Sequence, residues 1–285
     1  MAFIQCKECG YIITDETNTC PNCGSLISKK KNRKKGHIAA FLISILLTIG
    51  CTTAFFLLRP QENREKRYSL GMQYYDEGNY DKAMTYLKPL AEQGDADAQY
   101  SMGLCYQFGE QDGNMIEAVK WYGKAAAQEH AMAQYNLGVC YDRGEGVQRN
   151  LATAINLYKK AAEKGYSKAQ YNLAYYYHAG EGIEQNYLEA AKWYRKAAEQ
   201  GDVYAQNNLG LLYQHGDGVE QDGKEAVKWY RKAAESGYTY ALNNIGICYE
   251  AGFGVEKDEE EAKKWYAKAA AQGNVEAMEA LIRLR

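Results

Sequence analysis

Four cysteines near the start of the chain have the spacing of a metal site. They form two pairs, Cys6 with Cys9 and Cys20 with Cys23, and a glycine follows each pair. Two intervening residues let both thiolates of a pair face one ion, and the glycine allows a tight turn around the sulfur atoms. The pattern predicts four-cysteine zinc coordination. Two disulfides, or four idle thiols, are the alternatives.

The segment that holds these cysteines, residues 1–28, contains few apolar residues. A unit this small usually needs a metal to fold, and structural zinc supplies roughly 10–16 kcal/mol. Four thiolates leave no open coordination position, so we expect a structural Zn²⁺ rather than a catalytic one. The arrangement resembles the short zinc-ribbon domains at the N-terminus of many bacterial membrane proteins.

The rest of the chain offers little for catalysis. Its histidines form no His-x-x-x-His pair; they are His37, His130, His178 and His215. The chain also lacks a Gly-x-Ser-x-Gly motif and a phosphate-binding loop. The sequence therefore favours a protein that is not an enzyme.

A predicted membrane anchor follows the cysteine segment. Residues 29–37 form a basic juxtamembrane segment, and residues 38–58 contain no charge. About 20 apolar residues span a bilayer as a helix, so we expect a transmembrane helix at 38–58 and lipid contacts along 29–58. The six bases before the helix place the N-terminus in the cytoplasm and the rest of the chain on the exterior or periplasmic side of a bacterial membrane.

Two other interpretations of the apolar stretch remain open. A cleaved signal peptide has a shorter apolar region than this one. A lipoprotein signal would lipidate Cys51, but Thr48 stands where that signal has leucine, and cleavage there would discard the cysteine segment. We therefore favour an uncleaved anchor, followed by a charged stem at 59–67.

The charge distribution excludes one class of partner. Residues 1–59 hold 8 bases and 3 acids, which leaves 26 bases and 33 acids for the remainder of the chain. Nonspecific nucleic-acid binding needs a basic face, so we expect no nucleic-acid partner.

The chain is periodic from about residue 64. Equivalent alanines recur at intervals of 35, 36, 36 and 36 residues, at Ala98, Ala133, Ala169, Ala205 and Ala241. A small residue follows each alanine five positions later: Gly103, Gly138, Ala174, Gly210 and Gly246. The second half of each unit carries Trp121, Leu157, Trp193, Trp229 or Trp265, followed by tyrosine. A fixed period of this length predicts stacked helical pairs.

One unit shows how a pair forms. Apolar residues at helical spacing from Ala205 to Tyr213 predict a first helix, called the A helix, and Ala226 to Ala234 predict a second, called the B helix. Gly210 permits close approach of the two helices, and we expect the tryptophan to fill the space that the small residues leave. Gly237 ends the B helix as a cap.

These residues resemble the Sel-1-like repeat family, a relative of the tetratricopeptide repeat. The strings LGLLYQHGDGVEQD and AVKWYRKAAESG are close to its consensus. The resemblance implies an all-α fold, a right-handed α-solenoid of helical pairs, preceded here by the zinc ribbon and the transmembrane helix. We assign Sel-1-like repeats to 96–130, 131–166, 167–202, 203–238 and 239–274, a tetratricopeptide-like unit to 64–95, and a C-terminal capping helix to 275–285.

Three local features depart from a regular repeat. Pro89 lies inside a predicted B helix, where we expect a kink or an early end. Glu129 stands where the other repeats have the capping glycine. Cys105, Cys140 and Cys248 share one A-helix position, and we expect them to pack as small apolar groups.

The family resemblance implies protein recognition in a concave groove lined by A helices. By the tetratricopeptide pattern, the candidate partner-binding residues are Tyr100, Tyr135, Asn136, Tyr171, Asn172, Tyr175, Asn208 and Asn244. An asparagine amide both donates and accepts, and tyrosine supplies contact area at low entropic cost. These residues could instead bridge adjacent helices.

The sequence therefore predicts a membrane-anchored interaction scaffold that binds a peptide or protein partner. One alternative is a cell-envelope enzyme or enzyme accessory, since cysteine-rich relatives have been linked to β-lactam or cell-wall binding. Another inverts the topology and makes the solenoid a cytosolic assembly platform.

Overall fold

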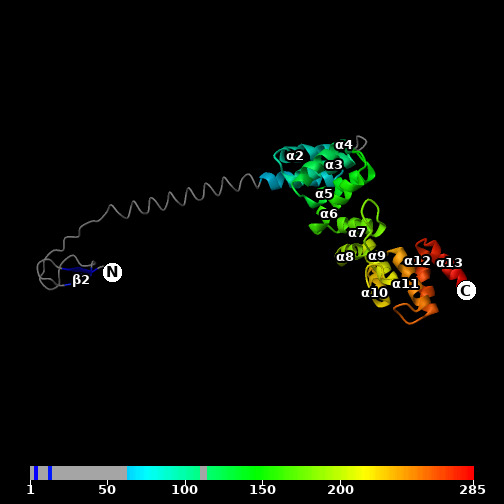
Figure 1. Ribbon diagram of the computed structural model, residues 1–285. Helices are drawn as coiled ribbons and strands as arrows, with labels where there is room; N and C mark the ends of the chain where they lie inside the picture. The colour runs from blue at the N-terminus through cyan, green and yellow to red at the C-terminus, as the bar shows by residue number, and fades with distance from the viewer. Residues whose placement is uncertain (1–2, 6–11, 15–62, 110–113) are drawn as a thin grey trace. The chain divides into compact units, whose positions relative to one another are not determined.

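The computed structural model describes residues 3–5, 12–14, 63–109 and 114–285 (Figure 1). The chain divides into two compact units, Met1–Asn63 and Arg64–Arg285. In the first unit, β1 (Phe3–Gln5) and β2 (Ile12–Thr14) pair in antiparallel fashion, with Phe3 opposite Thr14. In sequence, these strands lie on either side of the first cysteine pair.

The predicted zinc and membrane segments fall outside these residues. The four cysteines Cys6, Cys9, Cys20 and Cys23, the stretch 38–58 and Cys51 all lie there. Within the described ranges, no helix is both long enough and apolar enough to cross a membrane. The same ranges hold no group of His, Cys, Asp and Glu side chains that could bind a metal ion.

The second unit is an all-α solenoid in which A and B helices alternate. The A helices are residues 63–76, α3 (Ala96–Phe108), α5 (Ala131–Arg143), α7 (Ser167–Ala179), α9 (Val203–His215), α11 (Thr239–Ala251) and α13 (Val275–Arg283). The B helices are α2 (Tyr80–Glu92), α4 (Met115–Ala127), α6 (Leu151–Glu163), α8 (Tyr187–Glu199), α10 (Gly223–Glu235) and α12 (Glu259–Ala271). Successive helices from α2 to α13 contact each other, as Figure 1 shows from cyan to red.

Each B helix starts at a side chain that caps it. The caps are Asn79, Asn114, Asn150, Asn186, Asp222 and Asp258, and each side chain accepts a hydrogen bond from a backbone N–H of the first turn. Glutamates in the first turn of four of these helices add favourable charge near the helix N-terminus. This repeated Asn or Asp therefore sets where the B helix begins.

The contact between the helices of a pair depends on a tyrosine packed against a small residue. The tyrosines are Tyr122, Tyr158, Tyr194, Tyr230 and Tyr266, all nearly fully buried. A Cβ added at Gly210 would lie 2.5 Å from Cε1 of Tyr230, so the missing side chain leaves room for the ring.

The prediction that tryptophan fills this space was wrong. The tyrosine that follows the tryptophan lies against the glycine instead. Trp121 and Trp229 are buried elsewhere in the core, whereas Trp193 and Trp265 are only partly buried.

The expected early end of the helix at Pro89 is also wrong. Helix α2 contains Pro89 and continues to Glu92, which gives it the same 13 residues as the other B helices. Leu90 and Ala91 are buried directly after the proline. Their burial stabilises the last turn although the proline cannot donate a backbone hydrogen bond.

Glu129 adopts the backbone conformation of the glycine that it replaces. Its φ is +63°, and no other non-glycine residue within the described ranges has a positive φ. Replacing Glu129 with glycine should raise the Tm by about 2–4 °C, because a side chain is disfavoured in this conformation. Differential scanning calorimetry measures this change.

The control for this prediction is Lys164, whose Nζ lies 2.9 Å from Glu129 Oε2. The pair is exposed and contributes little, so Lys164→Ala should leave the Tm nearly unchanged. A lower Tm for Glu129→Gly would show that the ion pair outweighs the backbone strain.

Candidate functional site on the A-helix face

The predicted partner-binding residues all lie on A helices. Tyr100 belongs to α3, Tyr135 and Asn136 to α5, Tyr171, Asn172 and Tyr175 to α7, Asn208 to α9, and Asn244 to α11. Tyr175 is 44% exposed, and the other seven are partly buried. We call the surface that these eight residues form the A-helix face.

The asparagines of this face also hold neighbouring repeats together. Asn244 Nδ2 donates to Asn207 Oδ1 at 3.0 Å, between α11 and α9. Burial raises the pKa of Tyr122, and a hydrogen bond with the Asn136 side chain opposes that rise. Asn172 acts in the same way on Tyr158, whose pKa is also raised by burial. The bridging role that the sequence left open is therefore present.

A pocket of about 290 Å³ brings four of the eight residues together. They are Tyr135, Tyr171, Asn172 and Tyr175. The remaining lining comes from Val139, Asp142, Arg143, Tyr158 and Tyr176, so α5, α6 and α7 all contribute. Tyr100, Asn136, Asn208 and Asn244 lie outside this pocket.

Asp142 holds two of the aromatic side chains that line the pocket, Tyr158 and Tyr176. Its Oδ2 accepts hydrogen bonds from the hydroxyls of Tyr158, at 3.2 Å, and Tyr176, at 2.5 Å. The two rings stack with centroids 6.1 Å apart, and Tyr175 meets Tyr176 edge to face at 5.4 Å. Burial raises the pKa of both Tyr158 and Tyr176, so their phenols stay neutral and act as hydrogen-bonding groups.

The pocket forms where the chain departs from its own repeat. Tyr176 occupies the position of Cys105, Cys140, Leu212 and Cys248 in the other repeats. Tyr175 stands where they have Leu104, Val139, Leu211 and Ile247. The position of Asp142 varies among the repeats, and three of its equivalents also accept a hydrogen bond from the buried tyrosine of their own pair: Gln107, Gln214 and Glu250. Sequence reasoning missed Asp142 and Tyr176, although aligning the repeats with each other shows Tyr176 as an exception.

The three shared cysteines are buried, as the sequence predicts. Cys105, Cys140 and Cys248 are free thiols with at most 2% of their surface exposed. Burial raises the pKa of Cys140 and of Cys248 to about 11, so little reactive thiolate forms at neutral pH.

A histidine caps α5 beside Tyr100 at one end of the A-helix face. Nδ1 of His130 accepts a hydrogen bond from the Ala133 backbone N–H at 3.1 Å, and its ring stacks on Tyr100 with centroids 4.8 Å apart. Burial lowers the pKa of His130 from its ordinary value of 6.5, and Asp97, 3.4 Å from Nε2, opposes the shift.

This cap predicts a stability that depends on pH. A lowered folded pKa means that folding favours neutral His130, so its contribution is present above pH 6.5 and is lost as the pH falls through the folded pKa. Protonation at Nδ1 removes the cap, which costs about 1 kcal/mol. Chemical denaturation between pH 7 and pH 5 should show this loss in the wild type. His130→Asn, which caps at every pH, should show a smaller decrease, and an equal decrease would contradict the assignment.

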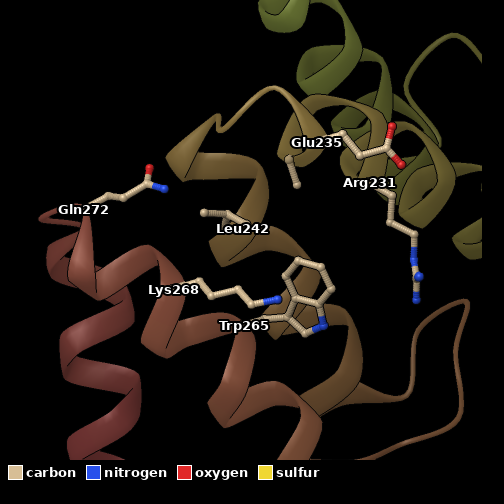
Figure 2. Close-up of a pocket in the computed structure, with 7 residues that line it drawn as sticks. Arg231, Glu235, Leu242, Trp265, Lys268 and Gln272 are labelled. Carbon is tan, nitrogen blue, oxygen red and sulfur yellow. The ribbon is translucent and has the colours of Figure 1, made fainter.

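A second pocket, of about 380 Å³, lies among α10, α11 and α12 (Figure 2). It lies where a leucine takes the place of a glutamine that is buried at the equivalent position of the earlier repeats. Gln99, Gln134, Gln170 and Gln206 each donate to a carbonyl near the end of the preceding B helix. Leu242 stands at the equivalent position and cannot donate.

The cations of this second pocket already have partners. Arg231 Nη2 donates to the Tyr249 hydroxyl at 2.7 Å, and Lys268 Nζ lies 4.1 Å from the centroid of the Trp265 ring. Figure 2 shows Lys268 and Trp265 side by side on one helix. Lysine–tryptophan contacts recur at Lys124, Lys196 and Lys232. These groups are part of the repeat structure, so we place the candidate site at the tyrosine pocket.

A Sel1 repeat family model matches residues 67–95, 96–130, 131–166, 167–202, 203–238 and 239–274. The chain belongs to the Sel1 repeat family. The same model matches the unit at 67–95, which the sequence analysis described as tetratricopeptide-like, so this Sel1 repeat protein has six matched repeats. No curated protein sequence matches it.

The solved structures that are similar to this Sel1 repeat protein include two from bacteria. A protective antigen of uropathogenic Escherichia coli, described as displaying an SLR fold, is 35% identical with a TM-score of 0.71; the match covers 76% of this chain and 48% of that chain. The protein therefore spans about half the length of that relative. A Sel1 repeat protein from Oxalobacter formigenes is 38% identical with a TM-score of 0.69, covering 75% of this chain and 86% of that chain.

Proposed function

We propose that this Sel1 repeat protein is an interaction scaffold that holds a protein partner on its A-helix face. The observation that carries the proposal is the pocket between α5 and α7, where Tyr175 and Tyr176 depart together from the repeat. Tyr175 is 44% exposed, so the packing of the helices does not require its ring, which favours a role in recognition.

The chemistry of the pocket suits binding rather than catalysis. Asp142 Oδ2 accepts hydrogen bonds from two phenols, and the raised pKa values of those phenols keep them neutral. Tyrosine and asparagine offer rigid contact area and adaptable hydrogen bonds. Arg143 supplies a mostly exposed guanidinium at the edge of the pocket.

Affinity purification from cells of the source organism tests this proposal. Proteins recovered with the wild type are compared with those recovered with an Asn172→Ala/Tyr175→Ala double variant and with a Leu188→Ala control. Leu188 is 55% exposed on α8 and is not part of the A-helix face. We expect the double variant to lose partners that the control retains, whereas recovery of the same partners by both would contradict the proposal.

We extend the proposal to a single-pass bacterial membrane protein. Residues 38–58 would span the membrane, and the N-terminus would stay in the cytoplasm, where reduced Cys6, Cys9, Cys20 and Cys23 would bind one structural Zn²⁺. The solenoid would then face the exterior or periplasm. One support for that side is that the relative from uropathogenic E. coli is described as a protective antigen.

Labelling of intact cells with a membrane-impermeant maleimide tests this topology. A cysteine at Gln148 suits the experiment, because Gln148 is exposed in the loop before α6, whereas neighbouring Asn150 caps that helix. The buried native thiols of the solenoid should react slowly. We expect Gln148→Cys to label in intact cells. Labelling only after lysis would place the solenoid in the cytosol.

A further inference from the structure

We propose that two copies of this protein associate through α13, packing the exposed apolar side of one α13 against that of the other in antiparallel fashion. This self-association goes beyond the proposed function and uses none of the eight residues of the A-helix face. Three features of α13 support it: an exposed apolar stripe, an isoleucine at a glycine position, and the order of charges along the helix.

The apolar stripe of α13 consists of Val275, Met278 and Ile282, and we call it the α13 face. Spacings of three and four residues put these side chains on one side of the helix, and all three are exposed. The opposite side packs into the core through Ala277 and Ala280. A helix that caps a solenoid needs a polar outer surface to stay soluble, so α13 does not have the surface of a cap.

The same side is covered in the preceding A helices. Met278 is 41% exposed, whereas the residues at its position in those helices are at most 7% exposed: Gln99, Gln134, Gln170, Gln206 and Leu242. The B helix of the same pair contributes to this cover, because Leu242 lies in one cluster with Ala262 and Tyr266 of α12. In the described part of the chain no B helix follows α13, which Figure 1 shows in red.

Ile282 argues against a further Sel1 B helix as the cover of this face. It stands at the position of the small residue that meets the buried tyrosine in each pair, which is Gly246 in the preceding repeat. A Cβ added at Gly246 would lie 2.6 Å from Cε1 of Tyr266, so an isoleucine leaves no room for such a tyrosine. The cover must be a surface without that ring, and α13 itself contains no aromatic residue.

The charges of α13 complement a second copy of the same helix. Glu276 and Glu279 lie toward its N-terminus, and Arg283 and Arg285 lie at its other end. Antiparallel packing about a two-fold axis puts the acidic part of each helix beside the basic part of the other, whereas parallel packing would bring like charges together. Arg283 binds Glu250 of its own chain through two of its N–H groups, and the other N–H groups of its exposed guanidinium can reach a carboxylate of the second copy.

Sedimentation velocity of the full chain in detergent micelles tests for this dimer. The chain is studied at concentrations from roughly 1 to 200 μM. We expect a reversible equilibrium between monomer and dimer with a Kd of roughly 10–100 μM, because the contact is smaller than a standard protein interface. A chain that stays monomeric over this range would overturn the inference.

Two variants with the same chemical change locate the interface. Ile282→Glu places a charge within the α13 face and should raise the Kd at least about tenfold. Ile116→Glu makes the same change on α4, at a side chain that is 60% exposed against 65% for Ile282, and should leave the Kd unchanged. Unchanged far-UV circular dichroism of both variants guards against a folding defect. Association through another segment would survive Ile282→Glu, and that result would also overturn the inference.

A charge reversal tests the antiparallel arrangement. Glu276→Arg should raise the Kd by roughly fivefold, because the new cation would face Arg283 of the second copy. In a parallel dimer, position 276 would face itself, and two arginines there would repel much as two glutamates do. An unchanged Kd for Glu276→Arg would therefore rule out antiparallel packing.

Discussion

Replacing Tyr230 with alanine should lower the free energy of unfolding by about 3–5 kcal/mol, the usual cost of removing a large buried aromatic side chain. Tyr230 is fully buried and its ring lies against Gly210. Its hydroxyl also donates to Gln214 Oε1 at 2.7 Å, so both packing and a hydrogen bond are lost. Chemical denaturation followed by far-UV circular dichroism measures the change.

Two further variants separate the loss of packing from the loss of the hydrogen bond. Tyr230→Phe removes only the hydroxyl and should cost about 1 kcal/mol. Tyr240→Ala removes a mostly exposed ring and should change stability by less than about 0.5 kcal/mol. If Tyr230→Ala costs no more than Tyr240→Ala, the tyrosine is not the residue that joins the two helices.

Replacing Gly210 with leucine should destabilise the protein by about 3 kcal/mol, because an overpacked core must displace its neighbours. The added Cβ would already lie 2.5 Å from the Tyr230 ring, before the rest of the side chain is placed. Thermal and chemical unfolding should both show that this variant is less stable than the wild type.

Gly123 provides a matched control for this substitution. It lies within α4, and no atom lies within 4 Å of the Cβ that a side chain would add there. Gly123→Leu should stabilise the protein by about 0.5–1 kcal/mol, because leucine is a better helix former than glycine. The same chemical change is therefore expected to have opposite signs at the two positions, and equal signs would contradict the packing described here.

The repeat period and its small residues predicted the helical pairs, because spacing along the chain determines which residues share a helix face. The period did not predict which aromatic residue meets Gly210. Trp229 and Tyr230 are adjacent on α10 and point about 100° apart around its axis, so the rotation of α10 decides which one lies against α9. That rotation depends on contacts with the neighbouring repeats.

The candidate site was predicted in part. Tyr135, Tyr171, Asn172 and Tyr175 follow from the groove positions of the family and meet in one pocket. Asp142 and Tyr176 belong to different helices, so only the distance between α5 and α7 shows that they bond. The helix that continues past Pro89 could not be predicted either, because its last turn depends on tertiary burial of Leu90 and Ala91.

Site-specific photo-crosslinking in living cells tests the central claim, that the partner binds the A-helix face. A photoreactive phenylalanine analogue is placed at Tyr175 or Tyr204, whose ring lies 5.8 Å from that of Tyr171, and at Leu188 or Ile116 on the B helices. All four side chains are exposed, so access to the solvent does not distinguish them. The account predicts the same crosslinked partner at Tyr175 and Tyr204 and none at Leu188 or Ile116. Crosslinks confined to the B-helix positions would contradict it.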